Sequence, residues 1–165
     1  GSTIGNMEPD AAVDLLRAMK ALLGDTSAGA RTTMLLIGMD RIKDRERLIA
    51  AYDDAAGVTA AFNLNLLTRI NRELAGDVPV EAFAHRAVWN DDKARIEMHL
   101  EATRAVRFQI AGQSFAMAAG ETIHTESSHK YGPRDSRLLL RAGGWEPVRE
   151  WTDGQGLFSL ILAQA

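Results

Sequence analysis

The stretch TTMLLIGMD, Thr32 to Asp40, decides the fold class. It is a continuous apolar run, without the polar and apolar alternation of a strand that has one face in water. Such runs are typical of strands buried on both faces, as in a parallel sheet covered by helices. The stretch therefore predicts an α/β sheet.

Helical periodicity surrounds this strand. Upstream, Pro9 opens a predicted helix with one apolar face, and Gly24 ends it. Downstream, the pattern predicts a helix over residues 44–56, a second helix capped by Thr59, and a short helix over residues 80–85. The apolar residues of the second helix that we expect to face inward are Phe62, Leu66, Leu67, Ile70 and Leu74.

The period then changes to two, which predicts an antiparallel meander over residues 87–119. A helix follows in RDSRLLLRAGG (134–144), and TDGQG (152–156) joins two final strands. A sheet that ends in two strands after the last helix, the final one antiparallel, is typical of class I methyltransferases. This order predicts the second half of a doubly wound, Rossmann-like domain, with the first half before residue 1.

Composition excludes several classes of partner. The 165 residues carry a net charge of −3 and no basic run, so we expect neither a nucleic acid nor an anionic membrane as partner. No apolar run reaches the roughly 20 residues that span a bilayer. The absence of cysteine fits a reducing cytoplasm. We expect a cytoplasmic, monomeric protein.

The stretch ETIHTESSHKY (121–131) gathers an acid, hydroxyls and two histidines. His124, Glu126 and His129 form the skeleton of a two-histidine, one-carboxylate iron site, as in metal-dependent oxygenases. Such sites usually take the last histidine from a distant strand, whereas His129 follows Glu126 by three positions. We therefore expect no metal, and a solvated polar loop is the plain alternative.

Five stretches, in order along the whole chain, resemble the L-histidine Nα-methyltransferases of ergothioneine biosynthesis. They are GSTIGN, AYDDAAGVTAAFNLNLLTRINREL, RIEMHL, AAGETIHTESSHKY and WTDGQGLFS. The resemblance implies a class I methyltransferase sheet with an inserted α+β substrate-binding domain. Residues 1–41 and 131–165 would form part of the methyltransferase domain, and residues 42–130 the insert.

The resemblance also implies S-adenosylmethionine (SAM) as cofactor and trimethylation of L-histidine to hercynine. The family's cofactor site lies mainly in its N-terminal half, so the cofactor-binding residues stay unassigned and we expect these 165 residues alone to be inactive. His129 and the second glycine of RAGGW depart from the family pattern without touching a substrate contact.

The family's substrate contacts match positions of this chain. Asn6 would bind and orient the reacting amine. Tyr52 would bind the α-carboxylate, and Met98 would line the pocket for the imidazole ring. Glu126 and Ser128, with Ser127 between them, would bracket the imidazole. A neutral imidazole has one N–H and one bare nitrogen, and residues two apart on an extended segment point the same way.

Alternatives stay open for these residues and for the function. Asn6 could cap a helix, while Tyr52 and Met98 could simply pack in a core. The chain could be a non-catalytic module that binds an amino acid or a betaine. It could also belong to a methyltransferase for another aromatic amino acid such as tryptophan, which the Glu126 and Ser128 pair disfavours because indole has one polar atom.

Overall fold

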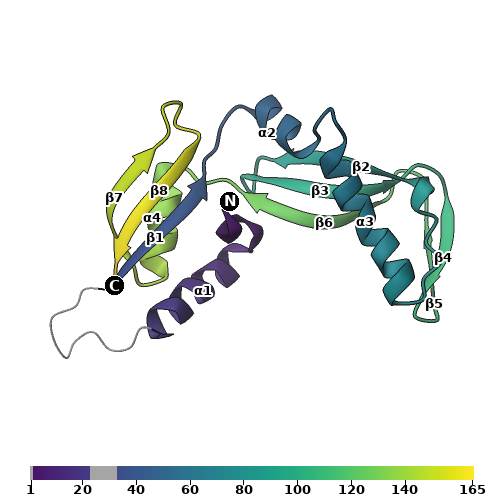
Figure 1. The fold of residues 1–165 in the computed structure, drawn as a ribbon, viewed down its shortest axis with the longest axis horizontal. Helices are drawn as coiled ribbons and strands as arrows, with labels where there is room; N and C mark the ends of the chain where they lie inside the picture. Colours follow the sequence, from purple (N-terminus) through teal and green to yellow (C-terminus); the bar gives the residue numbers. More distant parts are fainter. Residues whose placement is uncertain (1, 23–32) are drawn as a thin grey trace. The chain divides into compact units, whose positions relative to one another are not determined.

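The computed structural model describes residues 2–22 and 33–165. The chain divides into two compact units. The first unit contains residues 1–43, 91–95 and 127–165, and the second contains residues 44–90 and 96–126. Both helices and strands occur in each, so the chain is of the mixed α/β class (Figure 1). The predicted stop at Gly24 and the loop after it lie outside the described residues.

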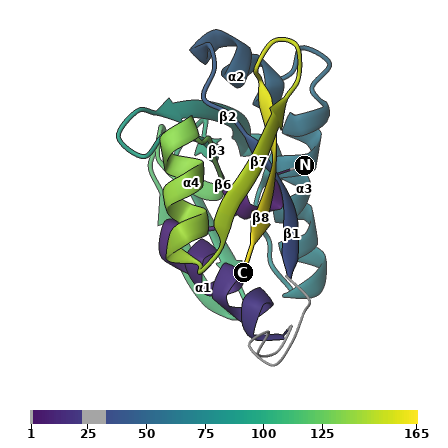
Figure 2. The ribbon, with the colours of Figure 1, turned by 90° about the vertical axis from the view of Figure 1, so that its left-hand side faces the viewer.

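The first unit is a three-stranded sheet with two helices (Figure 2). The sheet has the order β1-β8-β7, and both pairings are antiparallel. This confirms the predicted final hairpin and its antiparallel last strand. The elements of the unit are η1 (Thr3–Asn6), α1 (Pro9–Leu22), β1 (Met34–Asp40), α4 (Pro133–Ala142), β7 (Glu146–Thr152) and β8 (Phe158–Gln164).

Helices α1 and α4 pack their apolar faces against one face of this sheet. Leu16 of α1 and Leu140 of α4 are fully buried with Met39 of β1 and Ile161 of β8. Trp145, which follows α4, is also buried, and its indole N–H donates to the Leu16 carbonyl over 2.9 Å. Its one polar atom is thereby satisfied inside the core.

The prediction that both faces of β1 are buried was wrong for the described part of the chain. Its partner there is the antiparallel β8, and its burial alternates. Leu35 and Met39 are buried under the helices, whereas Met34 and Leu36 are 43% and 57% exposed. The strand is therefore apolar on both faces but covered on one.

The second unit holds the meander and two helices. Its elements are α2 (Arg45–Tyr52), α3 (Val58–Glu73), η3 (Val80–Ala82), β2 (Phe83–Asn90), β3 (Arg95–Ala102), β4 (Val106–Ile110), β5 (Gln113–Met117) and β6 (Thr122–His129). Arg95 and residues 127–129, at the ends of β3 and β6, belong to the first unit. The strands form a sheet of order β2-β3-β6 and a β4-β5 hairpin, and Leu67 of α3 packs into a core with Leu100 and Phe83.

Three local expectations need correction. The segment predicted as a short helix near residues 80–85 is a single 3-10 turn followed by β2. Helix α3 is not capped by Thr59; the Asp54 carboxylate accepts the N–H groups of Val58 and Thr59 instead. The burial of α3 also differs from the prediction, because Leu67 and Asn63 are buried while Phe62, Leu66 and Leu74 are exposed.

Among the described helices, none has the length and apolar character needed to cross a bilayer.

Candidate functional site

Residues Thr3–Asn6 of the GSTIGN motif form η1, whose backbone packs against the end of β6. Ile4 and Gly5 are buried and Asn6 is exposed. A β-carbon on Gly5 would lie 2.8 Å from the carbonyl oxygen of His129, and the Tyr131 hydroxyl donates to the Ile4 carbonyl over 3.3 Å. The motif carrying Asn6 therefore lies beside the segment that carries Ser128. Since α1 begins at Pro9, Asn6 is not its N-cap.

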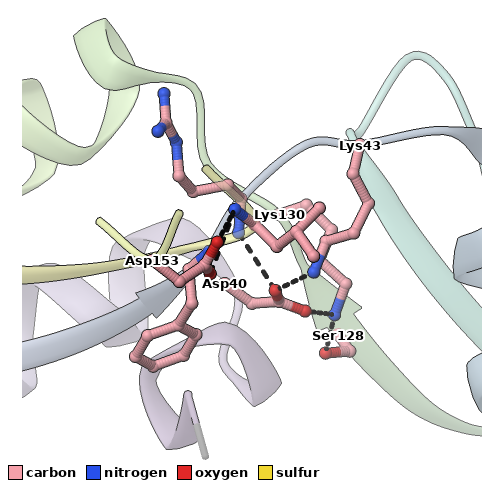
Figure 3. A network of polar contacts seen from close by, with 8 residues as sticks. Asp40, Lys43, Ser128, Lys130 and Asp153 are labelled. Atoms are coloured by element: carbon pink, nitrogen blue, oxygen red, sulfur yellow. Dashed lines mark hydrogen bonds and ion pairs between the residues drawn. The ribbon is translucent and has the colours of Figure 1, made fainter. Parts of the chain in front are cut away.

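Ser128 is buried in a network of charged groups within the first unit (Figure 3). The Lys130 ammonium donates to the Ser128 hydroxyl oxygen over 2.6 Å and lies 3.0 Å from the Asp40 carboxylate. Lys43 is a second partner of Asp40. Burial raises the pKa of Asp40, but the hydrogen bonds and charges of Lys43 and Lys130 outweigh it and hold that pKa below its ordinary value.

Asp153, the fifth labelled residue of Figure 3, fixes the β7-β8 hairpin loop. Its carboxylate accepts backbone N–H groups of Gln155, Leu157 and Phe158. These hydrogen bonds lower the pKa of Asp153. The aspartate of the WTDGQGLFS motif thus holds the backbone of this loop.

His129, the residue after Ser128, lies in a second polar cluster. The buried Arg95 guanidinium hydrogen-bonds the Glu8 carboxylate, and His129 Nε2 lies 4.0 Å from that carboxylate. Burial, followed by the positive charge of Arg95, lowers the pKa of His129, which favours the neutral form of its ring. His129 thus packs with Glu8 and Arg95 in the first unit.

Glu126 borders a pocket of ≈ 190 Å³ in the second unit. Helix α3 supplies one wall through Phe62, Asn63 and Leu66, and β6 supplies the other through Thr125 and Glu126. Phe62 and Leu66, which were expected in the core, therefore line a hollow beside Glu126. Helical periodicity marks such residues as apolar but cannot distinguish a core from a pocket wall.

Met98 and Tyr52 are both packed in the second unit. Met98 is buried on β3, and its carbonyl accepts the Thr125 hydroxyl over 2.9 Å, so it lies on the strand next to Glu126. Tyr52 ends α2 and packs with Leu48 and Ile96. Core packing thus accounts for part of each residue's role. Ser127 is half-buried on β6.

Sequence reasoning missed a hydrogen-bond chain behind Tyr52. The buried Asn63 amide nitrogen lies 3.0 Å from His85 Nδ1 and also donates to the His99 carbonyl over 3.2 Å. Because an amide nitrogen is only a donor, His85 Nδ1 accepts and its Nε2–H donates to the Tyr52 carbonyl over 2.7 Å. The signal was an asparagine within an otherwise apolar helical face.

The described residues contain one group with metal-ligand chemistry, and it differs from the His124, Glu126 and His129 alternative that the sequence raised. Glu97, His99 and His124 bring one ligand atom each within 4.8 Å of one another. The two rings are stacked, with centroids 4.8 Å apart and planes 19° apart, and His124 Nε2 lies 3.1 Å from the Glu126 carbonyl. Nearly parallel rings direct their in-plane lone pairs side by side rather than toward one ion.

The structure thus brings Asn6 and Ser128 onto adjoining segments of the first unit. It places Tyr52, Met98 and Glu126 in the second unit, with Met98 and Glu126 on neighbouring strands. Lys130 contacts Ser128, His85 contacts Tyr52, and Asn63 contacts His85; none of these three residues was predicted.

Comparison with known proteins gives a consistent family. The model of the family described as "Histidine-specific methyltransferase, SAM-dependent" matches residues 1–165. The histidine N-alpha-methyltransferases of Mycolicibacterium smegmatis and Mycobacterium tuberculosis are 44% and 42% identical over 99% of this chain and 50% of their own length. Ergothioneine biosynthesis protein 1 of Neurospora crassa is 28% identical over 100% of this chain and 18% of its own.

The chain spans about half the length of the two bacterial relatives. The family match covers every motif on which the resemblance rested, from GSTIGN to WTDGQGLFS, and confirms that resemblance. The chain belongs to the family of SAM-dependent, histidine-specific methyltransferases.

Proposed function

We propose that the protein carrying this chain transfers methyl groups from SAM to the α-amino nitrogen of L-histidine, making hercynine for ergothioneine biosynthesis. The observation that carries the proposal is the identity of 44% with a histidine N-alpha-methyltransferase over 99% of this chain. The motifs expected to bind histidine, GSTIGN and HTESS, are present in full.

SAM supplies an electrophilic methyl group when bound. We assign none of the described residues to it, because no glycine-rich turn joins a strand to a helix within residues 2–22 and 33–165. The residues of this chain contribute to the substrate side of the reaction.

Asn6 is proposed to aim the reacting amine. Methyl transfer is an in-line displacement, so the amine must be unprotonated and its lone pair must face the methyl carbon. An α-amino group has a pKa near ~8, so part of it is neutral at working pH without a strong base. Correct alignment alone can lower the activation barrier by roughly 7–11 kcal/mol at best. An exposed amide at the end of η1 can orient an N–H and leave the lone pair open.

Glu126 and Ser128, with Ser127 between them, are proposed to recognise the imidazole ring through hydrogen bonds. The ring N–H would donate to the Glu126 carboxylate, and the bare nitrogen would accept the Ser128 hydroxyl. Strand β6 holds both residues in an extended segment, which supports the two-point contact. Tyr52 is proposed to bind the carboxylate, and Met98 to contact the ring.

The test uses the full-length protein with SAM and either L-histidine or L-tryptophan, and mass spectrometry of the products. We expect histidine carrying up to three methyl groups on its α-nitrogen, and a loss of kcat in Asn6→Ala. Gln113→Ala, which removes an exposed amide on β5, is the control. Methylation of tryptophan in preference to histidine would overturn the substrate assignment, and histidine binding without methyl transfer would favour the non-catalytic module.

A further inference from the structure

Helix α2 ends at Tyr52, and a histidine from β2 caps that end. The last carbonyls of an α-helix have no partner within the helix. The Nε2–H of His85 donates to the Tyr52 carbonyl over 2.7 Å and satisfies one of them. The helix has 8 residues, and Leu48 is the one that is buried. Helices of this length are marginal on their own, so contacts such as this one determine where the end of α2 lies.

The buried amide of Asn63 determines which nitrogen of His85 carries the hydrogen. One end of this amide lies 3.2 Å from the His99 carbonyl, which can only accept, so that end is the NH2 group. The same NH2 group lies 3.0 Å from His85 Nδ1, which is therefore the acceptor. The ring hydrogen is then on Nε2, facing the Tyr52 carbonyl. Asn63 thus keeps His85 in the tautomer that can cap α2.

Attachment of α3 to the sheet does not by itself account for this chain of hydrogen bonds, which lies within the second unit. The Asn63 amide already joins α3 to β3 through the His99 carbonyl. The same amide also donates to His85 on β2, and from there the chain continues to the last residue of α2. The chain therefore ends on Tyr52, the residue that is proposed to bind the α-carboxylate of the substrate.

We propose that His85 is a positioning residue that places Tyr52 for its contact with the α-carboxylate of L-histidine. This inference rests on the proposed function, in which Tyr52 binds that carboxylate. The Tyr52 side chain is half-buried and packs with Leu48 and Ile96, so its direction follows the backbone at the end of α2. Loss of the hydrogen bond from His85 lets that backbone shift. A misplacement of about 1 Å in the binding geometry can cost on the order of a hundredfold in rate.

Two amide substitutions separate the capping of α2 from the packing of His85. The side-chain nitrogen of glutamine lies as many bonds from Cα as Nε2 of histidine, so His85→Gln retains a donor for the Tyr52 carbonyl. The amide of asparagine ends at the position of Nδ1, so His85→Asn keeps a polar group beside Asn63 and loses the contact with Tyr52. The experiment compares both variants with Tyr52→Phe and with the double variant Tyr52→Phe/His85→Asn. It measures kcat and KM for L-histidine in the full-length protein with SAM.

We expect Tyr52→Phe to raise KM about tenfold or more, as the loss of a hydrogen bond to a charged group does. His85→Asn should raise KM about fivefold and change kcat less, because the carboxylate is not the group that reacts. His85→Gln should keep KM within about twofold of the wild-type value. The KM of the double variant should lie within about twofold of that of Tyr52→Phe, because the histidine acts through the tyrosine.

Equal KM values for His85→Gln and His85→Asn, or additive losses in the double variant, would overturn the positioning role while leaving histidine methylation intact. An unchanged KM in Tyr52→Phe would overturn the proposed carboxylate contact together with this inference. If the wild-type protein does not methylate histidine, the proposed function itself is wrong. Circular dichroism checks folding. Should His85→Asn not fold, His85→Met has the length of glutamine without a donor and must raise KM in its place.

Discussion

Gly5 and His129 approach so closely that a β-carbon on Gly5 would lie 2.8 Å from the His129 carbonyl oxygen. The neighbour is backbone, which cannot rotate away as a flexible side chain would. This contact joins the motif that carries Asn6 to the end of the strand that carries Ser128. Packing therefore requires Gly5 of the GSTIGN motif to be a glycine.

Gly5→Ala should displace η1 and with it Asn6. Overpacking of this kind costs about 1–3 kcal/mol, so we expect a lower melting temperature. We also expect a higher KM for histidine in the full-length protein, because the reacting amine is held less well. Gly154→Ala is the control, since nothing lies within 4 Å of a β-carbon there. Equal behaviour of the two variants would contradict the packing role of Gly5.

Asp40→Asn should destabilise the first unit, because it removes the counter-charge of the buried Lys130. Breaking a buried pair by removing one partner costs about 3–5 kcal/mol, and we expect about 3 kcal/mol because Lys130 keeps its bond to Ser128. Urea unfolding at neutral pH measures the effect. Asp14→Asn, at a side chain that is 77% exposed, should change the free energy of unfolding little.

The effect of Asp40 should also depend on pH. Its pKa lies below the ordinary value of 3.8 in the folded protein, so the carboxylate contributes stability at pH values above 3.8. That contribution is lost as the pH falls through the lowered folded value. The difference in unfolding free energy between wild type and Asp40→Asn should therefore be constant near neutrality and shrink below about pH 4. A difference that grows on acidification would contradict this.

Asn63→Asp should destabilise the second unit. The amide nitrogen of Asn63 donates to His85 Nδ1 and the His99 carbonyl, and a carboxylate can donate to neither. Leaving a buried acceptor unsatisfied costs about 1–3 kcal/mol. Asn65→Asp, two positions along the same helix and exposed, introduces the same charge without that loss. Equal melting temperatures for the two variants would show that the buried hydrogen bonds contribute nothing.

Much of the fold followed from periodicity and turn residues. The Pro9 helix start, the meander and the hairpin around Asp153 depend on contacts close in sequence, so their patterns identify them. The burial of β1 was mispredicted because apolar residues show that a strand face can be buried. They do not show whether another element packs on that face. The start of α3 was mispredicted because Asp54 caps it from four positions before Val58.

In the candidate site, too, contacts between residues far apart in the sequence could not be predicted. The resemblance identified Asn6 and Ser128, but not the residues that hold them. Lys130 is charged and follows a polar stretch, which normally indicates a solvated loop. The burial of Lys130 depends on its ion pair with Asp40, which lies 90 positions earlier in the chain. No local sequence pattern predicts that pairing. The Asn63 and His85 chain likewise joins two elements 22 residues apart.

The stacked His99 and His124 rings predict that the cluster of Glu97, His99 and His124 retains no stoichiometric transition metal in the purified full-length protein. Their planes are 19° apart, so their lone pairs do not converge on a tetrahedral ion, although Glu97 is close enough to add a carboxylate. Elemental analysis after incubation with zinc and desalting measures the metal content. We expect the same low content in wild type and Glu97→Gln. One retained equivalent of zinc that disappears in Glu97→Gln, but not in Glu101→Gln on the same strand, would show instead that His124 turns to complete a metal site.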